Sequence, residues 1–237
     1  MDIKNATVFI TGANRGLGLA FAREARLRGA ARVYAGMRKT DGFNEPGIIP
    51  VKIDVTDPAS ITAAAASAAD TTVLINNAGI AALIDGPLSA EVAAQSARMF
   101  DTNYYGVVRV TQAFEPNLST KPNAAIINVL SDIVWLPRPI LAPYAASKAA
   151  AWSYTNQLRF HLRDRGVQVL GLHVGFVDTD LTSGIDVPKA SPADVVRQTF
   201  DALAAGKSEV MADQGTTVLK GTLAAEEPGY ITPPQGL

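Results

Sequence analysis

A tyrosine and a lysine stand four residues apart at Tyr144 and Lys148, within Tyr-Ala-Ala-Ser-Lys. On a helix this spacing places both side chains on one face, so that an ammonium group lies close to a phenol. A free tyrosine has a pKa of about 10, too high for acid–base work at neutral pH. A nearby cation lowers that pKa by stabilising the phenolate, so the pair suits proton transfer at an oxygen atom. The spacing is common on helices and needs a context before it indicates catalysis.

A serine thirteen residues before Tyr144 supplies that context. Ser131 follows the apolar run 125–130, which is typical of a buried strand, and three prolines separate it from the tyrosine. The prolines keep the connection non-helical until the helix that carries Tyr144 begins. Open α/β folds bind ligands at the carboxyl ends of their strands, so Ser131 is placed to donate a hydrogen bond to a carbonyl oxygen.

A glycine-rich turn near the N-terminus suggests a second ligand. Gly12, Gly16 and Gly18 follow the apolar run 6–11 and lead into a segment of helical period. A strand, a glycine turn and a helix N-terminus together present free N–H groups and the positive end of a dipole to a pyrophosphate. A tight structural turn is the alternative for the glycines alone. No Lys-Ser or Lys-Thr pair follows them, which disfavours a nucleotide-triphosphate P-loop.

Cations occupy the position that selects between dinucleotides. An Asp or Glu at the end of the second strand would bind a free ribose 2′-hydroxyl and repel a 2′-phosphate. Here that strand ends in Tyr-Ala-Gly-Met followed by Arg38 and Lys39, and Arg15 lies inside the glycine turn. Solvated surface cations are the alternative, which we favour for Lys39. For Arg15 and Arg38 together we predict a clamp on the 2′-phosphate of NADP(H).

Short β-rich runs alternate with Ala-rich segments of helical period along the chain. We expect strands at 6–11, 32–35, 49–53, 73–75, 125–130, 167–174 and 209–211. We expect helices at 16–28, 58–69, 89–114, 144–165 and 192–205. Strands that are apolar on both faces and alternate with helices imply a parallel sheet covered on both sides. The sequence therefore predicts an α/β, doubly wound Rossmann fold, a seven-stranded parallel sheet in a single domain over residues 1–237.

Composition argues against several classes of function. The net charge of −1 gives no sign of a nucleic-acid partner or an anionic membrane surface. The absence of cysteine removes disulfides, thiol nucleophiles and thiolate metal sites. His161 and His173 lie in expected regular elements and are interpreted as structural, so we expect no metal. Apolar runs fall short of the ~18 residues of a membrane span and the N-terminus lacks the order of a signal peptide, which predicts a cytoplasmic protein.

In their order and spacing the motifs resemble those of the short-chain dehydrogenases/reductases, over roughly residues 5–212. The similar motifs are Thr11-Gly12-x-x-x-Gly16-x-Gly18 as the cofactor turn, Asp54-Val55 beside the adenine, Asn76-Asn77-Ala78-Gly79 beside the cofactor, and Thr179 near the nicotinamide carboxamide. The resemblance implies hydride transfer between NADP(H) and a carbonyl or alcohol. The residues expected to bind the cofactor are Gly12, Asn14, Arg15, Gly16, Leu17, Gly18, Arg38, Asp54, Val55, Asn77, Ala78, Gly79, Tyr144, Lys148, Gly175, Val177 and Thr179.

The same resemblance implies a catalytic set made of Asn103, Ser131, Tyr144 and Lys148. Tyr144 is then the general acid in reduction, and Lys148 holds the ribose hydroxyls and lowers the tyrosine pKa. Asn103 continues a proton relay from the lysine through water. A lyase-like relative, or a non-catalytic NADP-binding sensor, is the alternative; the intact glycine turn and catalytic set disfavour both.

Three departures from the family's pattern limit what the resemblance implies. Val174-Gly175 stands where many members have Pro-Gly, the lid segment 176–191 is short, and the tail 207–237 lacks the glycine-rich ending of many tetrameric members. In this family, helices equivalent to 89–114 and 144–165 form a dimer interface. We expect a homodimer, with the homotetramer as the alternative.

The residues around Ser131 and Tyr144 predict a mostly apolar substrate pocket. Its expected lining is Ile80, Ile84, Ile133, Trp135, Leu136, Phe176 and Leu181. Asp132 is expected to point into solvent; the alternative is that it repels anionic substrates. Apart from Lys148, Arg138 is the one cation that could serve a substrate anion. We therefore predict a neutral, hydrophobic ketone or aldehyde as the substrate.

Overall fold

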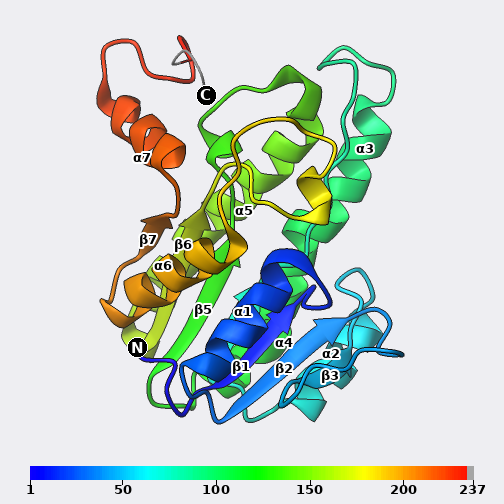
Figure 1. The fold of residues 1–237 in the computed structure, drawn as a ribbon, viewed down its shortest axis with the longest axis vertical. Helices are drawn as coiled ribbons and strands as arrows, with labels where there is room; N and C mark the ends of the chain where they lie inside the picture. The colour runs from blue at the N-terminus through cyan, green and yellow to red at the C-terminus, as the bar shows by residue number, and fades with distance from the viewer. Residues whose placement is uncertain (234–237) are drawn as a thin grey trace.

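The computed structural model describes residues 1–233, which are built around a seven-stranded sheet (Figure 1). The strands are β1 (Thr7–Thr11), β2 (Arg32–Met37), β3 (Ile49–Lys52), β4 (Val73–Asn76), β5 (Ala124–Val129), β6 (Val167–His173) and β7 (Glu209–Met211). Their order is β3-β2-β1-β4-β5-β6-β7, and each neighbouring pair is parallel. The predicted doubly wound parallel fold is confirmed.

Helices cover both faces of the sheet. They are α1 (Gly16–Leu27), α2 (Pro58–Ser67), α3 (Val92–Phe100), α4 (Gly106–Leu118), α5 (Ala142–His161), α6 (Pro192–Ala204) and α7 (Gln214–Gly221). One buried apolar cluster joins α1 and α6 to the sheet, and a second joins α2, α4 and α5 to its other face. Figure 1 shows α1 and α6 in front of the strands. Within residues 1–233 no helix has the length and apolarity needed to cross a membrane.

Strand β1 contributes side chains to the apolar clusters on both faces of the sheet. Val8 and Ile10 belong to the cluster under α1 and α6, whereas Phe9 between them packs with Phe114 of α4 on the opposite face. Successive side chains of a strand point to opposite faces, so a run that is apolar at every position must be covered twice. Each fully buried large side chain contributes about 1.5–3 kcal/mol.

The expected helix 89–114 is interrupted in the structure. It begins at Val92, and a π-helical turn at Asp101–Tyr105 separates α3 from α4. A π-helical turn carries one extra residue per turn, which hydrophobic periodicity does not reveal, and such turns are frequent at functional sites. This one contains the buried Asn103.

The C-terminal tail adds an edge strand and a short helix. β7 pairs with β6, and α7 begins after Asp213, whose side chain accepts from the Thr216 N–H. Figure 1 shows α7 beyond β7, near the carboxyl edge of the sheet. Residues 234–237 of the predicted tail lie outside the described residues.

Candidate active site

A cavity of about 390 Å³ lies at the carboxyl ends of six parallel strands. Residues that follow β1, β2, β3, β4, β5 and β6 line it, because parallel strands all end at the same edge of the sheet. Its size is that of a site for a small molecule or part of a cofactor. All the residues predicted to bind the cofactor line this cavity, although they come from segments far apart in the sequence.

The glycine turn has the geometry that a pyrophosphate cradle requires. Gly12 has a φ of +66°, a conformation that L side chains rarely adopt. A Cβ atom at Gly18 would collide with the carbonyl oxygen of Gly12, so a side chain there would push helix and strand apart. The Asn77 side chain holds the turn by donating to the carbonyl oxygens of Thr11 at 2.9 Å and Gly12 at 3.2 Å. The backbone at the N-terminus of α1 is thereby open to a phosphate group.

The corner expected to hold the 2′-phosphate carries cations at its surface. Met37 and Arg38 line the cavity at the end of β2, so no carboxylate stands there. The Arg15 guanidinium is paired at 3.0 Å with Asp180, which lies in the segment after β6, and both side chains are mostly exposed. The sequence did not indicate that Asp180 would reach Arg15 across the cavity mouth.

Asp54 lines the cavity beside this corner. The Thr56 N–H donates to its carboxylate at 2.9 Å and the Thr56 hydroxyl at 2.7 Å. These hydrogen bonds, first that of the N–H and then that of the hydroxyl, lower the pKa of Asp54. Its side chain is thereby fixed as a carboxylate at the cavity wall.

Tyr144 and Lys148 lie in the first turns of α5, which begins two residues earlier than expected, at Ala142. Lys148 is buried and its Nζ donates to the carbonyl oxygen of Val129 at 2.8 Å. The same Nζ lies 5.8 Å from the centre of the Tyr144 ring. Burial lowers the pKa of Lys148 to about 8, because a low-dielectric environment disfavours the charged form.

The pKa of Tyr144 is raised in the structure, whereas Lys148 was expected to lower it. Burial raises the pKa of Tyr144, and the negative charge of Asp132 raises it further. A hydrogen bond from Ser131 and the positive charge of Arg138 act in the opposite direction and are outweighed. The phenol therefore holds its proton at neutral pH.

Asp132 is the clearest correction to the sequence analysis, since it does not point into solvent. It is buried, and Arg138 binds both of its oxygens, at 3.1 Å to Oδ1 and 2.9 Å to Oδ2. The Ser131 hydroxyl lies 3.1 Å from Oδ1 of the same carboxylate. The Arg138 guanidinium also lies 5.0 Å from the centre of the Phe176 ring. The two charges therefore form a neutral pair in the cavity wall.

Asn103 lies behind the cavity rather than in its lining. Its side chain accepts from the Ile80 N–H at 2.8 Å and donates to the Ile80 carbonyl at 2.9 Å and to the Ser147 hydroxyl at 3.0 Å. These bonds fasten the segment after β4 to α5. They show a structural role, and the proton relay stays a prediction.

Of the residues predicted for the substrate pocket, four line the cavity and three do not. Ile80, Ile133, Phe176 and Leu181 are in the lining. Ile84 is buried elsewhere, and Trp135 and Leu136 pack against Leu219 of α7. A turn of 3₁₀-helix at Asp132–Val134 carries the chain away from the cavity before it reaches Trp135. The tryptophan thus belongs to the support of the site rather than to its surface.

Comparison with known proteins identifies the family. The family model described as short chain dehydrogenase matches residues 6–189, and the chain belongs to this family of oxidoreductases. It is 34% identical to a short chain dehydrogenase from Burkholderia cenocepacia J2315, whose crystal structure is a complex with NADP; 95% of each chain is covered, with a TM-score of 0.90. It is 30% identical over 224 residues to the uncharacterized oxidoreductase DltE of Bacillus subtilis, covering 89% of each.

A third relative has a more specific name. The NADPH-dependent 1-acyldihydroxyacetone phosphate reductase of Schizosaccharomyces pombe is 34% identical over 185 residues, which are 74% of this chain and 61% of that protein. These relatives, together with the parallel sheet, make the chain a short-chain dehydrogenase/reductase.

Proposed function

We propose that the chain is an NADP(H)-dependent carbonyl reductase that transfers a hydride between NADP(H) and a neutral, hydrophobic ketone or aldehyde, or the corresponding secondary alcohol. The observation that carries the proposal is that one cavity joins the glycine cradle to Ser131, Tyr144 and Lys148. The residues of the cradle fit a dinucleotide because the absence of a Cβ atom at Gly18 lets α1 pack closely on β1, so that the N-terminus of α1 lies at the cavity.

Two arginines support NADP(H) as the preferred cofactor. Arg15 and Arg38 line the cavity at the corner where a 2′-phosphate would lie. The ion pair between Arg15 and Asp180 is exposed to water and therefore weak, so a phosphate can replace Asp180 as the partner of Arg15. NADPH should therefore be used at least about tenfold more efficiently than NADH, the effect of roughly one charge-assisted hydrogen bond. Steady-state kinetics with both cofactors, in the native protein and in a variant with both arginines replaced by alanine, test this; equal efficiency in the native protein would refute it.

Ser131, Tyr144 and Lys148 each have a role in reduction. When bound, the cofactor supplies the hydride. Tyr144 supplies the proton to the carbonyl oxygen; its phenol is protonated at neutral pH, and burial makes it a weaker acid than a free tyrosine. Ser131 donates a hydrogen bond to the same oxygen, for which its hydroxyl must turn away from Asp132. Lys148, anchored on Val129, lies where it can hold ribose hydroxyls beside the phenol.

The neutral Asp132–Arg138 pair supports a substrate without charge. A carboxylate or phosphate would have to displace Asp132 from Arg138, and that exchange would leave a buried carboxylate unpaired. Ile80, Ile133, Phe176 and Leu181 supply apolar contacts around the reacting carbonyl. We therefore expect an uncharged keto ester to be turned over faster than the keto acid of similar size.

NADPH oxidation measured against a panel of ketones, aldehydes, keto esters and keto acids tests the proposal. Uncharged ketones or aldehydes should be reduced, and the keto acids should react more slowly than their esters. Faster turnover of a keto acid than of its ester would refute the proposed substrate class. A lyase-like member of the family would instead convert its substrate with no change in NADPH.

We also propose a homodimer formed through α4 and α5. Tyr105 before α4 and Phe160 in α5 are large apolar residues that stay exposed in the single chain. Burying them against a second copy would remove apolar surface from water. A dimeric mass in solution at micromolar concentration is expected, and a monomeric mass would contradict it.

A further inference from the structure

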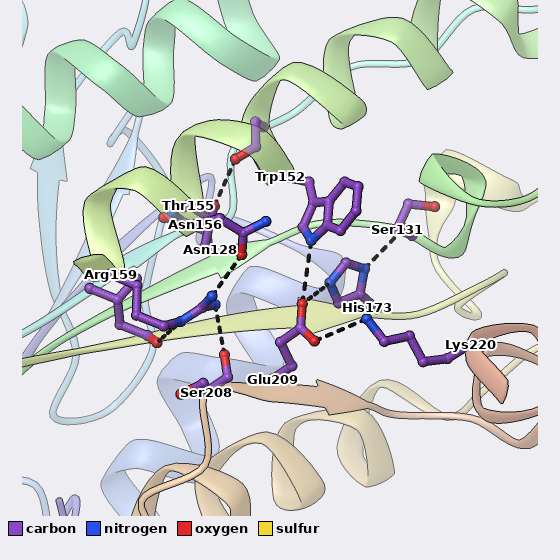
Figure 2. Close-up of polar contacts among 12 residues, drawn as sticks. Asn128, Ser131, Trp152, Thr155, Asn156, Arg159, His173, Ser208, Glu209 and Lys220 are labelled. Atoms are coloured by element: carbon purple, nitrogen blue, oxygen red, sulfur yellow. Dashed lines mark hydrogen bonds and ion pairs between the residues drawn. The ribbon is translucent and has the colours of Figure 1, made fainter. Parts of the chain in front are cut away.

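A buried histidine contacts the backbone of the proposed catalytic serine from behind. The side chain of His173, the last residue of β6, is completely buried, and its Nδ1 lies 3.3 Å from the carbonyl oxygen of Ser131 (Figure 2). The N–H of the same peptide, on Asp132, donates to the carbonyl oxygen of Val174 at 3.2 Å. The peptide that joins Ser131 to Asp132 is therefore held on both sides by consecutive residues of one segment.

The orientation of the histidine ring depends on the C-terminal tail. Its Nε2 lies 3.4 Å from Oε1 of Glu209, the first residue of β7. Lys220 of α7 donates to the other oxygen of Glu209 at 3.1 Å, and the Trp152 indole donates to Oε1 at 3.3 Å. Figure 2 shows these side chains converging on Glu209 from three elements. The Trp135 ring stacks on the imidazole with their centres 4.2 Å apart.

The charges around the ring reinforce this arrangement. Contact with His173, and then with Lys220, lowers the pKa of Glu209 to about 2, so the carboxylate stays ionised. The Lys220 ammonium also lies 4.4 Å from the centre of the Trp135 ring, as in a cation–π contact. The Ser131 carbonyl oxygen and the Glu209 carboxylate only accept hydrogen bonds, so the two contacts together require a proton on each ring nitrogen of His173.

We propose that His173 is a positioning residue for Ser131, and that Glu209 and Lys220 of the tail hold the ring in place. The inference rests on the proposed function, because it takes Ser131 to be the donor to the substrate carbonyl. Fixing the peptide after Ser131 fixes the backbone on which its hydroxyl turns. It also fixes the start of the turn that carries Asp132. Small displacements of a reacting group are costly in rate, so support behind the serine should show in turnover.

Two substitutions at His173 separate its two contacts. The side-chain amide nitrogen of His173→Asn takes roughly the place of Nδ1 and can still donate to Ser131. The side-chain amide nitrogen of His173→Gln instead takes roughly the place of Nε2 and reaches toward Glu209. This variant leaves the Ser131 carbonyl oxygen without a donor. We expect His173→Asn to keep kcat within about threefold of the native protein, and His173→Gln to lower kcat by about tenfold or more. The Kd for NADPH, measured by fluorescence, should be unchanged in both.

The result that overturns the inference is equal kcat in the two variants. Ser131→Ala and Tyr144→Phe, assayed beside them, test the proposed function separately. If these two retain full activity, the proposed function fails. If they are inactive while the two His173 variants match each other, only the positioning role fails. A purely structural histidine would lower thermal stability in both variants without separating their kcat values.

Lys220 gives a second test that leaves the buried ring in place. We expect Lys220→Met to lower kcat severalfold at unchanged NADPH affinity, because Glu209 loses the cation that holds it. Lys207→Met removes an exposed lysine from the same tail and serves as the matched control. Native kcat in both lysine variants would overturn the role assigned to the tail. This test holds even if the His173 variants do not fold.

Discussion

Two arginine–aspartate pairs stand at opposite ends of one cavity, and their surroundings differ sharply. Arg15 and Asp180, at the end proposed to bind the cofactor (the cofactor end), have side chains that are 70% and 67% exposed. Arg138 and Asp132, at the end proposed to bind the substrate (the substrate end), are only 18% and 7% exposed, and the arginine binds both carboxylate oxygens. An exposed pair is weak and open to exchange, whereas a buried pair is costly to break. We therefore expect similar residues to receive an anionic ligand at one end and to exclude it at the other.

The largest effect is expected from a substitution of Tyr144, which should lower turnover while leaving NADPH affinity almost unchanged. Tyr144→Phe removes the proton donor and leaves the glycine cradle and Lys148 intact. Turnover should fall by about 10²–10⁴-fold. The Kd for NADPH should stay within about twofold, because general-acid catalysis and ground-state cofactor binding are separate terms. Stopped-flow reduction measures turnover, and fluorescence titration measures the Kd for NADPH. If Tyr144→Phe lowered turnover and NADPH affinity together, catalysis and cofactor binding would not be separate functions of the two ends.

Of the two ion pairs, the buried Arg138–Asp132 pair should contribute more to the free energy of unfolding than the exposed Arg15–Asp180 pair. Arg138→Gln leaves the Asp132 carboxylate buried without its partner, so we expect the free energy of unfolding to fall by about 3 kcal/mol. Arg15→Gln is the matched control and should cost less than about 1 kcal/mol. Urea denaturation at neutral pH measures both. Adding Asp132→Asn to the Arg138→Gln variant should restore most of the loss, since it removes the unpaired charge. A similar cost for the two arginines would contradict the contrast drawn between the pairs.

Local sequence signals were enough to select the residues proposed to bind the cofactor, all of which line one cavity. The glycines, the missing acid after Met37 and the arginines beside it all act close to their own positions in the chain, so spacing along the sequence was sufficient. The substrate end depends on where the loop after β5 turns. Arg138 reaches back to Asp132 within a proline-rich segment, and no periodic pattern encodes such a contact. Trp135 was placed in the pocket by proximity to Ser131, and the 3₁₀ turn between them removed it.

Lys148 adds a dependence of stability on pH. It is buried, and within residues 1–233 no carboxylate pairs with its ammonium group. Its pKa of about 8 lies below the ordinary value of 10.5. Below pH 8 the lysine is charged in both the folded and the unfolded protein, so the cost of burying the charge is fully present. Between about pH 8 and pH 10 the folded protein loses this proton while the unfolded chain keeps it. The free energy of unfolding should therefore rise through this window, by up to about 3 kcal/mol.

Lys148→Met provides the control for this rise. The difference in the free energy of unfolding between the native protein and the variant should grow in favour of the native protein from pH 8 to pH 10. Tyr144, with its raised pKa, affects stability only at higher pH, where the unfolded chain begins to lose its phenolic proton. Chemical denaturation at several pH values tests this, and a flat difference between the two proteins would contradict the burial of a charged lysine.

The smallest effect is expected at Asp180, where the exposed pair competes with the cofactor. An incoming 2′-phosphate must share Arg15 with this carboxylate or displace it. Asp180→Asn frees the guanidinium and removes a like charge, so NADPH should bind about two- to threefold more tightly. NADH has no 2′-phosphate and should gain less. The gain in NADPH affinity should be smaller when Arg15 is already alanine, because Asp180 and the phosphate then no longer compete for it. The gain should also decrease at high salt, because exposed charges are screened. Weaker NADPH binding by Asp180→Asn would instead mean that Asp180 holds Arg15 in the orientation that the phosphate requires.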